Sequence, residues 1–298
     1  MGHRYVVVLP SYESFLLLLE VTMKEGIILG NTFDLIKDID NESVDLIICD
    51  GPYGVTTFEW DNIASIQQFN LNLLKLFSRV LKPGGSLYLF GKDNCIDFID
   101  YTAYLKLNRR IVWYQPSRLA QGRYNYTNNY DIIAYFSKGK ASTFNLDDIR
   151  VEQLVELEHR KRCERVPSVQ NGPYGKTKFN DKGKNPGDVW GDIKQLTYKS
   201  KELVERELLN TIQKPIKLIE RLVLASSNEG DLVLDPFSGV GTTAVVCKKL
   251  NRRFVGFEMN EKYVRLSNER LNGGHINTSD SSTQEAGLFD EQPTLFGF

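Results

Sequence analysis

The stretch LVLDPFSGVGTT occupies residues 232–243 and decides the fold of this 298-residue chain. It opens with an apolar run typical of a buried strand, and Gly239 and Gly241 then separate that strand from a helix predicted over residues 242–250. A glycine-rich turn in this context lets a cofactor approach the backbone. The same spacing also occurs in plain tight turns, and Ala244 in place of a third glycine leaves a dinucleotide site open.

Glu258 is the acidic partner of this turn in sequence. It comes 17 residues after Gly241, at the end of a strand predicted over residues 254–257. A carboxylate in this place is suited to accept hydrogen bonds from ribose hydroxyls.

Outward from this stretch, apolar strands alternate with helical periodicity. The alternation predicts βαβ units and therefore an α/β fold with a doubly wound, mostly parallel sheet. Pro215 suits a helix start, and the run from Lys82 to Gly85 stops a helix. The predicted strands are residues 27–30, 43–50, 87–90, 111–113, 131–136, 232–235 and 254–257. The predicted helices lie at 32–38, 66–81, 242–250 and 261–271, and a further helix begins at residues 214–215.

A second motif, Asp50-Gly51-Pro52-Tyr53, ends the most apolar strand and should lie at the carboxyl edge of the sheet, where open α/β folds hold ligands. Methylation of an exocyclic amino nitrogen would need such a site. The lone pair of this nitrogen is delocalised, and two acceptors, the Asp50 carboxylate and the Gly51 carbonyl, could draw it toward a reactive geometry. Tyr53 offers a face for a planar base. An Asp-Gly turn that only caps the next segment is the alternative.

Together the two motifs resemble the β-class amino methyltransferases of DNA, in which the catalytic segment precedes the cofactor segment. Asp50-Gly51-Pro52-Tyr53 resembles the family's D-P-P-Y motif, and residues 235–243 resemble its F-x-G-x-G cofactor motif. The resemblance covers roughly residues 25–272 and implies a Rossmann-like methyltransferase sheet with a circularly permuted motif order. It also implies S-adenosylmethionine as cofactor, adenine N6 as the methylated atom, and a base flipped out of the duplex.

The resemblance also assigns residues to roles. Asp50, Gly51, Pro52 and Tyr53 are the implied catalytic residues. The implied cofactor-binding residues are Asn31, Gln213, Lys214, Pro215, Asp235, Phe237, Gly239, Gly241, Thr242 and Glu258. The sequence departs from the family's pattern at Gly51, where the family has Pro, at Asn31, where Asp is common, and at residues 210–212, where the family's His-Pro-Thr is replaced.

The net charge of −1 hides two basic stretches. Residues 160–201 hold 11 Lys and Arg against four acids, and residues 108–130 hold four Arg and no acid. In this family context they predict a surface for double-stranded DNA, although charged stretches are often simply solvated. The candidate DNA-binding residues are Arg109, Arg110, Arg118, Arg123, Tyr124, Lys176 and Lys178.

The expected organisation has five parts. Residues 1–22 are a dispensable extension, 23–144 the catalytic half, 145–205 an inserted target-recognition segment, 206–272 the cofactor half, and 273–298 a flexible acidic tail. Gln292, Leu295 and Phe296 in the tail resemble the peptide with which bacterial DNA-handling proteins bind the replication sliding clamp. A homodimer is a further candidate assembly.

The amino-acid composition excludes several classes of protein. With 41% hydrophobic and 25% charged residues, the chain is neither wholly disordered nor collagenous. Its four scattered cysteines predict no disulfide framework or zinc site, and the default location is the cytoplasm. The apolar run in residues 6–21 is too interrupted to span a membrane and lacks a signal-peptide cleavage site.

The sequence is also compatible with several other functions. They are cytosine N4 methylation, an RNA or protein amide methyltransferase, a dinucleotide oxidoreductase and a catalytically silent DNA-binding subunit. Cys49 beside Asp50 also raises cytosine C5 chemistry through a thiolate, but its place in an apolar strand favours a buried, inert side chain.

Overall fold

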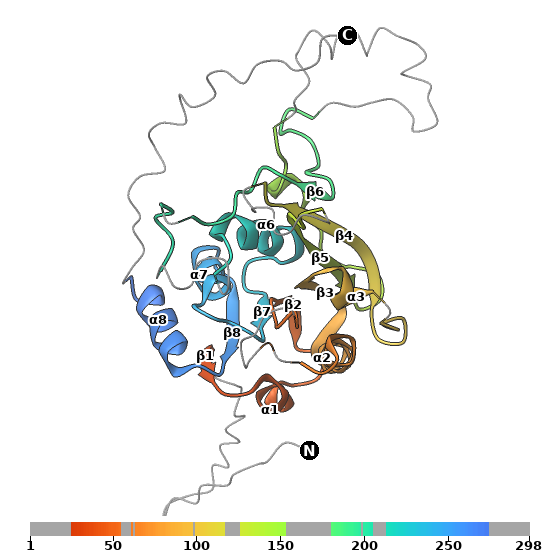
Figure 1. The fold of residues 1–298 in the computed structure, drawn as a ribbon, viewed down its shortest axis with the longest axis vertical. Helices are drawn as coiled ribbons and strands as arrows, with labels where there is room; N and C mark the ends of the chain where they lie inside the picture. The colour runs from red at the N-terminus through yellow and green to blue at the C-terminus, as the bar shows by residue number, and fades with distance from the viewer. Residues whose placement is uncertain are drawn as a thin grey trace, which may run out of the picture.

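The computed structural model describes residues 25–54, 61, 63–97, 99–116, 126–152, 180–197, 199–204 and 213–273. The strands of this part of the chain are β1 (Gly26–Leu29), β2 (Val44–Cys49), β3 (Leu81–Gly91), β4 (Lys106–Tyr114), β5 (Tyr130–Ser137), β6 (Val189–Trp190), β7 (Leu232–Asp235) and β8 (Arg253–Glu258). They form one sheet in the order β1-β8-β7-β2-β3-β5-β4-β6 (Figure 1).

Five neighbouring strands, from β1 to β3 in this order, run parallel to one another. Their carboxyl ends therefore meet at one edge of the sheet, which we call the carboxyl edge. The segments that leave this edge carry Asn31, Asp50, Asp235 and Glu258. β2 and β7 pair side by side although they lie far apart in sequence, so the chain order switches between them. In open α/β folds this is where ligands bind.

Helices cover both faces of the sheet (Figure 1). The described helical segments are α1 (Thr32–Leu35), η1 (Ile36–Asp38), α2 (Ile66–Val80), α3 (Asp93–Ile96), η3 (Leu146–Asp148), α6 (Ile216–Ser226), α7 (Thr242–Lys249) and α8 (Glu261–Leu271). Side chains of β2 alternate between the faces, as a doubly covered strand requires. Ile47 joins the core under α2, whereas Leu46 and Ile48 join the core under α6 and α7.

The predicted fold class is confirmed, with differences in detail. β5 runs antiparallel to both β3 and β4. β3 begins at Leu81, directly after α2, rather than at residue 87, because Leu81 already pairs with Val44 before the register shifts to Leu46 and Ser86. Gly84, with φ of +82°, lies within this irregular stretch.

Part of the segment predicted as an irregular insertion belongs to the sheet. β6 pairs in parallel with β4. Trp113 Nε1 on β4 donates a hydrogen bond to the carbonyl of Ile193 at 2.8 Å, and Trp190 is buried. A strand of two residues gives no periodicity, which is why sequence patterning missed it.

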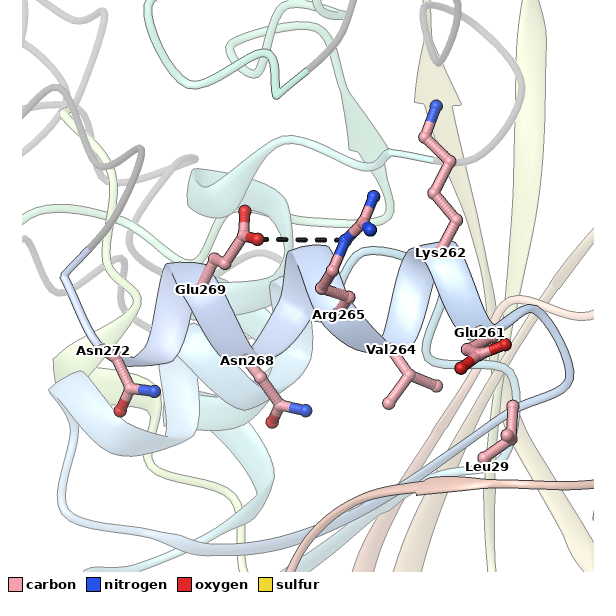
Figure 2. Close-up of a pocket in the computed structure, with 8 residues that line it drawn as sticks. All are labelled: Leu29, Glu261, Lys262, Val264, Arg265, Asn268, Glu269 and Asn272. Atoms are coloured by element: carbon pink, nitrogen blue, oxygen red, sulfur yellow. Dashed lines mark ion pairs between the residues drawn. The ribbon is translucent and has the colours of Figure 1, made fainter.

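Two surface features complete the fold. No helix in the described ranges is long and apolar enough to cross a membrane. A groove lies on the outer side of α8, beside the end of β1, and Figure 2 shows the Arg265 and Glu269 side chains paired along it. None of the predicted site residues lines this groove, whose lining consists of Leu29, Glu261, Lys262, Val264, Arg265, Asn268, Glu269 and Asn272.

Candidate active site at the carboxyl edge

Asp50 leaves β2 at the carboxyl edge and is held from two sides. Its Oδ1 accepts a hydrogen bond from the Tyr53 hydroxyl at 2.7 Å. Its Oδ2 forms an ion pair with Lys214 Nζ, and both side chains of this pair are largely buried. Lys214 precedes α6, 164 residues further along the chain. The fold therefore joins a residue of the predicted catalytic motif to one of the predicted cofactor residues.

The Lys214 ammonium lies between two aromatic rings. Its Nζ is 5.6 Å from the ring centroid of Tyr53 and 5.4 Å from that of Phe90, at the end of β3. These distances permit cation–π attraction. Burial and the nearby Asp50 raise the pKa of Tyr53 well above its usual value, so its phenol stays protonated and donates to Asp50. Sequence reasoning missed Phe90, which reads as an ordinary core residue of its strand.

The backbone after Pro52 is fixed by another carboxylate. Asp61 is 2% exposed, and its Oδ1 accepts hydrogen bonds from the backbone N–H groups of Tyr53 and Gly54, both at 2.7 Å. The Tyr53 carbonyl accepts a weak hydrogen bond from Cys95 Sγ at 3.6 Å. Sequence reasoning singled out Phe58 and Trp60 in this region, which lie outside the described residues, and passed over Asp61.

The glycine-rich turn after β7 packs against residues 50–54, which contain the predicted catalytic motif and are called the catalytic turn below. A Cβ added at Gly51 would lie 3.1 Å from the Phe237 ring, tighter than ordinary contact. Gly241 has φ of +74°, and a Cβ there would lie 2.8 Å from Ser267 Cβ. Both the conformation and the space therefore favour glycine at position 241.

Glu258 holds this turn in place. Its Oε2 accepts the backbone N–H of Gly239 at 2.8 Å, and its Oε1 accepts that of Asn260 at 2.7 Å. Burial raises the pKa of the Glu258 carboxyl. The Gly30 N–H donates a hydrogen bond to the Glu258 carbonyl, which places the next residue, Asn31, beside Glu258. The exposed Asn31 side chain caps α1.

Asp235 brings a third carboxyl group to the carboxyl edge. It is 7% exposed, and its pKa is raised to about 7, chiefly by burial. Hydrogen bonds from Thr243 and Phe237 oppose the rise, and the charges of Asp50 and Glu258 add to it. Because Asp50 is paired with Lys214, Asp235 and Glu258 are the two carboxyl groups that remain beside the glycine-rich turn, and such a pair suits a cationic ligand. This donor set fits S-adenosylmethionine, which carries a sulfonium and an ammonium group.

Other predicted cofactor residues are engaged in structural contacts. Gln213 is buried; its Oε1 accepts the Val204 N–H at 3.0 Å and its Nε2 donates to the Glu202 carbonyl at 2.5 Å. Thr242 Oγ1 accepts from Arg270 at 3.3 Å inside the first turn of α7. Pro215 is the N-cap of α6.

The two predicted DNA-binding arginines that the structure describes lie side by side on β4. Arg109 Nη1 lies 3.6 Å from Asp188 Oδ2, and Arg110 Nη1 lies 2.6 Å from Asp97 Oδ1. Adjacent residues of a strand point to opposite faces, so these two do not form one charged surface by themselves. The other five, Arg118, Arg123, Tyr124, Lys176 and Lys178, lie outside the described residues.

Cys49 does not fit the role of a nucleophile. Its side chain is fully buried at the end of β2. Burial and the nearby Asp235 raise the pKa of its thiol well above the usual value. A nucleophilic cysteine requires the opposite shift, so the structure disfavours the cytosine C5 alternative.

Comparison with known proteins agrees with this arrangement. A family model described as DNA methylase matches residues 44–269. The Type II methyltransferase M.HpaI of Haemophilus parainfluenzae is 35% identical over 84% of this chain and 74% of its own length. For M1.MboII of Moraxella bovis the identity is 35% over 83% and 96%. The DNA adenine methyltransferase YhdJ of Escherichia coli (strain K12) is 34% identical over 82% of each chain.

Solved structures share the fold at lower identity. The M1.HpyAVI complex with SAM superimposes with a TM-score of 0.55 at 21% identity, covering 83% of this chain and 98% of that one. PvuII DNA methyltransferase, titled cytosine-N4-specific, gives a TM-score of 0.57 at 17% identity over 88% and 89%. Because the DNA methylase model spans residues 44–269 and M.HpaI is 35% identical over 84% of the chain, the chain belongs to the DNA methylase family of amino methyltransferases.

Proposed function

We propose that this protein transfers a methyl group from S-adenosylmethionine to the N6 amino group of adenine in a specific sequence of double-stranded DNA. One observation carries the proposal. Asp50 holds a nitrogen donor, the Lys214 ammonium, against the rings of Tyr53 and Phe90. An adenine amino group is also a nitrogen donor, and it is attached to a planar ring that stacks on aromatic side chains.

In the proposed reaction the adenine takes the place of the Lys214 ammonium. The Asp50 carboxylate and the Gly51 carbonyl accept the two N–H groups, and Tyr53 stacks on the base. Bound S-adenosylmethionine supplies an electrophilic methyl group on sulfur. The amine nitrogen would take this methyl group as its bond to sulfur breaks, which leaves a neutral thioether, and the nitrogen would release one proton that Asp50 is placed to accept.

Lys214 must leave Asp50 when the amine arrives. Its place beside the carboxyl edge lets its ammonium turn from Asp50 toward the carboxylate of the cofactor's methionine part, the role that the family resemblance gives it. We propose that Lys214 exchanges between these two acceptors. Asp235, Phe237, Gly239, Gly241, Glu258 and Asn31 then hold the rest of the cofactor, while Gln213, Pro215 and Thr242 brace the elements around it.

A pH dependence of cofactor binding follows from Asp235. Its pKa of about 7 means that the free protein holds a proton on this group below neutral pH. A cationic cofactor favours the ionised carboxylate, so binding releases that proton. Affinity should therefore rise about tenfold between pH 6 and pH 8 and level off above.

Calorimetry in two buffers of different ionisation enthalpy measures this proton release directly. The Asp235→Asn variant cannot ionise at this position and serves as the control, with an affinity that changes little over the same range. Equal proton release by both proteins would assign the effect to another group.

Cytosine N4 methylation is the second candidate. The same acceptors can hold the amino group of cytosine, and a protein titled as a cytosine-N4-specific methyltransferase shares the fold. Adenine is favoured because the relative YhdJ is named a DNA adenine methyltransferase. The aspartate at position 50 also favours adenine, since the cytosine-N4 enzymes of the family more often carry serine there.

Finer assignments are part of the same proposal. Residues 145–205 recognise the target sequence, the two basic stretches bind the DNA backbone, and the target base flips out of the duplex. The protein acts in the cytoplasm, and a homodimer is a candidate assembly. Gln292, Leu295 and Phe296, outside the described residues, dock on the sliding clamp.

The clamp assignment has its own test. A peptide of residues 285–298 should bind purified sliding clamp in the micromolar range, typical of short docking segments. Replacing Leu295 and Phe296 with alanine should remove this binding while methylation of naked DNA is unchanged. No binding at high micromolar clamp would end the assignment.

A further inference from the structure

Asp61 contacts the catalytic turn in a way that neither the motifs nor the family resemblance assigns. One of its oxygens accepts two consecutive backbone N–H groups, those of Tyr53 and Gly54, each at 2.7 Å. Hydrogen bonds to a carboxylate are shorter and about twice as strong as neutral ones. Asp61 is 2% exposed, so water competes little for these bonds.

The backbone on both sides of Tyr53 is restrained by further features. Pro52 has a fixed φ, Gly54 adopts φ of +66°, and the Tyr53 carbonyl accepts from the buried Cys95 thiol. The backbone N–H and the backbone carbonyl of Tyr53 are therefore both hydrogen-bonded. With its backbone fixed, the tyrosine directs its hydroxyl at Asp50, 2.7 Å away.

We propose that Asp61 is a positioning residue that sets the placement of the Tyr53 ring and, through the Tyr53 hydroxyl, of the Asp50 carboxylate. This inference rests on the proposed function, in which Tyr53 stacks on the target base and Asp50 accepts its amino group. Asp61 itself touches neither substrate nor cofactor. Asp61 contributes by fixing the backbone position of the catalytic turn. A displacement of a reacting group by about 1 Å in such a site can lower the rate about 100-fold.

The test compares variants by the rate of methyl transfer to unmethylated genomic DNA and by the affinity for S-adenosylmethionine. In Asp61→Ala both acceptor bonds are lost, so kcat should fall about 100-fold. Cofactor affinity should stay within about threefold, because Asp61 bonds to the catalytic turn and not to the glycine-rich turn. Asp61→Asn keeps an acceptor oxygen in the same place and should recover at least about tenfold of the lost rate.

The structure offers a matched control at the opposite end of β2. Asp45 is also a carboxylate that accepts a backbone N–H, that of Leu232 at 2.9 Å, and it pairs with Lys82. Asp45→Ala should lower the melting temperature and leave kcat within about threefold of the wild type. This result would separate loss of stability from loss of positioning.

The outcomes are distinct. A folded Asp61→Ala protein with wild-type kcat, or one that loses cofactor affinity together with rate, overturns the proposal. If Asp61→Ala does not fold, Asp61→Glu decides, because it keeps the charge and displaces the acceptor by one methylene; an unchanged kcat then overturns it. Failure of the wild-type protein itself to methylate DNA would instead contradict the proposed function.

Discussion

Replacing Asp50 with alanine should reduce methyl transfer by on the order of 100- to 1,000-fold, the range seen when a single transition-state hydrogen-bond partner is removed from an active site. Asp50 is the shared acceptor for Tyr53 and Lys214, and in the proposed reaction it accepts the target amine. Binding of S-adenosylmethionine should persist, because the glycine-rich turn is built by other residues. Calorimetry with the cofactor measures this directly.

Removing Asp50 also leaves the largely buried Lys214 without its carboxylate. The Asp50→Asn variant and the double variant Asp50→Ala with Lys214→Met control for this unpaired charge. Both should be as inactive as the single variant while melting closer to the wild-type protein. Loss of cofactor binding together with activity in both Asp50→Ala and Asp50→Asn would move Asp50 into the cofactor site or the fold.

Valine at Gly241 should weaken cofactor binding by about tenfold or more, equivalent to about 1.4 kcal/mol. The position has φ of +74°, and a new Cβ would press on Ser267 at 2.8 Å. Ser267 Oγ donates to the Gly239 carbonyl at 3.1 Å, so the strain reaches the turn that lies against Glu258. Titration with the cofactor at constant pH checks the loss.

Gly230 provides the matched control for this substitution. It also has a positive φ, of +81°, but no atom lies within 4 Å of an added Cβ, and it precedes β7 at the opposite edge of the sheet. Gly230→Val should therefore cost stability through backbone strain alone and leave cofactor affinity unchanged. If the two variants weaken cofactor binding equally, the effect is general destabilisation and not a distortion of the site.

The fold was predictable because its signals are local. Apolar runs ending in Asp50 and Asp235, and helical spacing after Ser65 and Asn260, repeat the βαβ pattern without ambiguity. The turn at residues 50–53 was equally visible in the sequence, because four consecutive residues carry its motif.

Contacts between distant residues were not predictable in the same way. Lys214 was assigned to the cofactor by the family resemblance. Only the pairing of β2 with β7 and the placement of α6 bring it to Asp50. Asp61 accepts a hydrogen bond from the Tyr53 backbone, and Phe90 places its ring against the Lys214 ammonium. Neither contact leaves a pattern in a single sequence. Gln213 and Thr242 belong to the predicted set, yet their side chains brace the fold.

Nucleoside mass spectrometry of unmethylated DNA treated with this protein and isotope-labelled S-adenosylmethionine tests the proposed methylation of adenine N6 directly. We expect labelled N6-methyladenine, formed by the wild-type protein and lost with Asp50→Ala. Labelled N4-methylcytosine as the sole product, or no labelled nucleoside from a folded protein that binds the cofactor, would contradict the proposal.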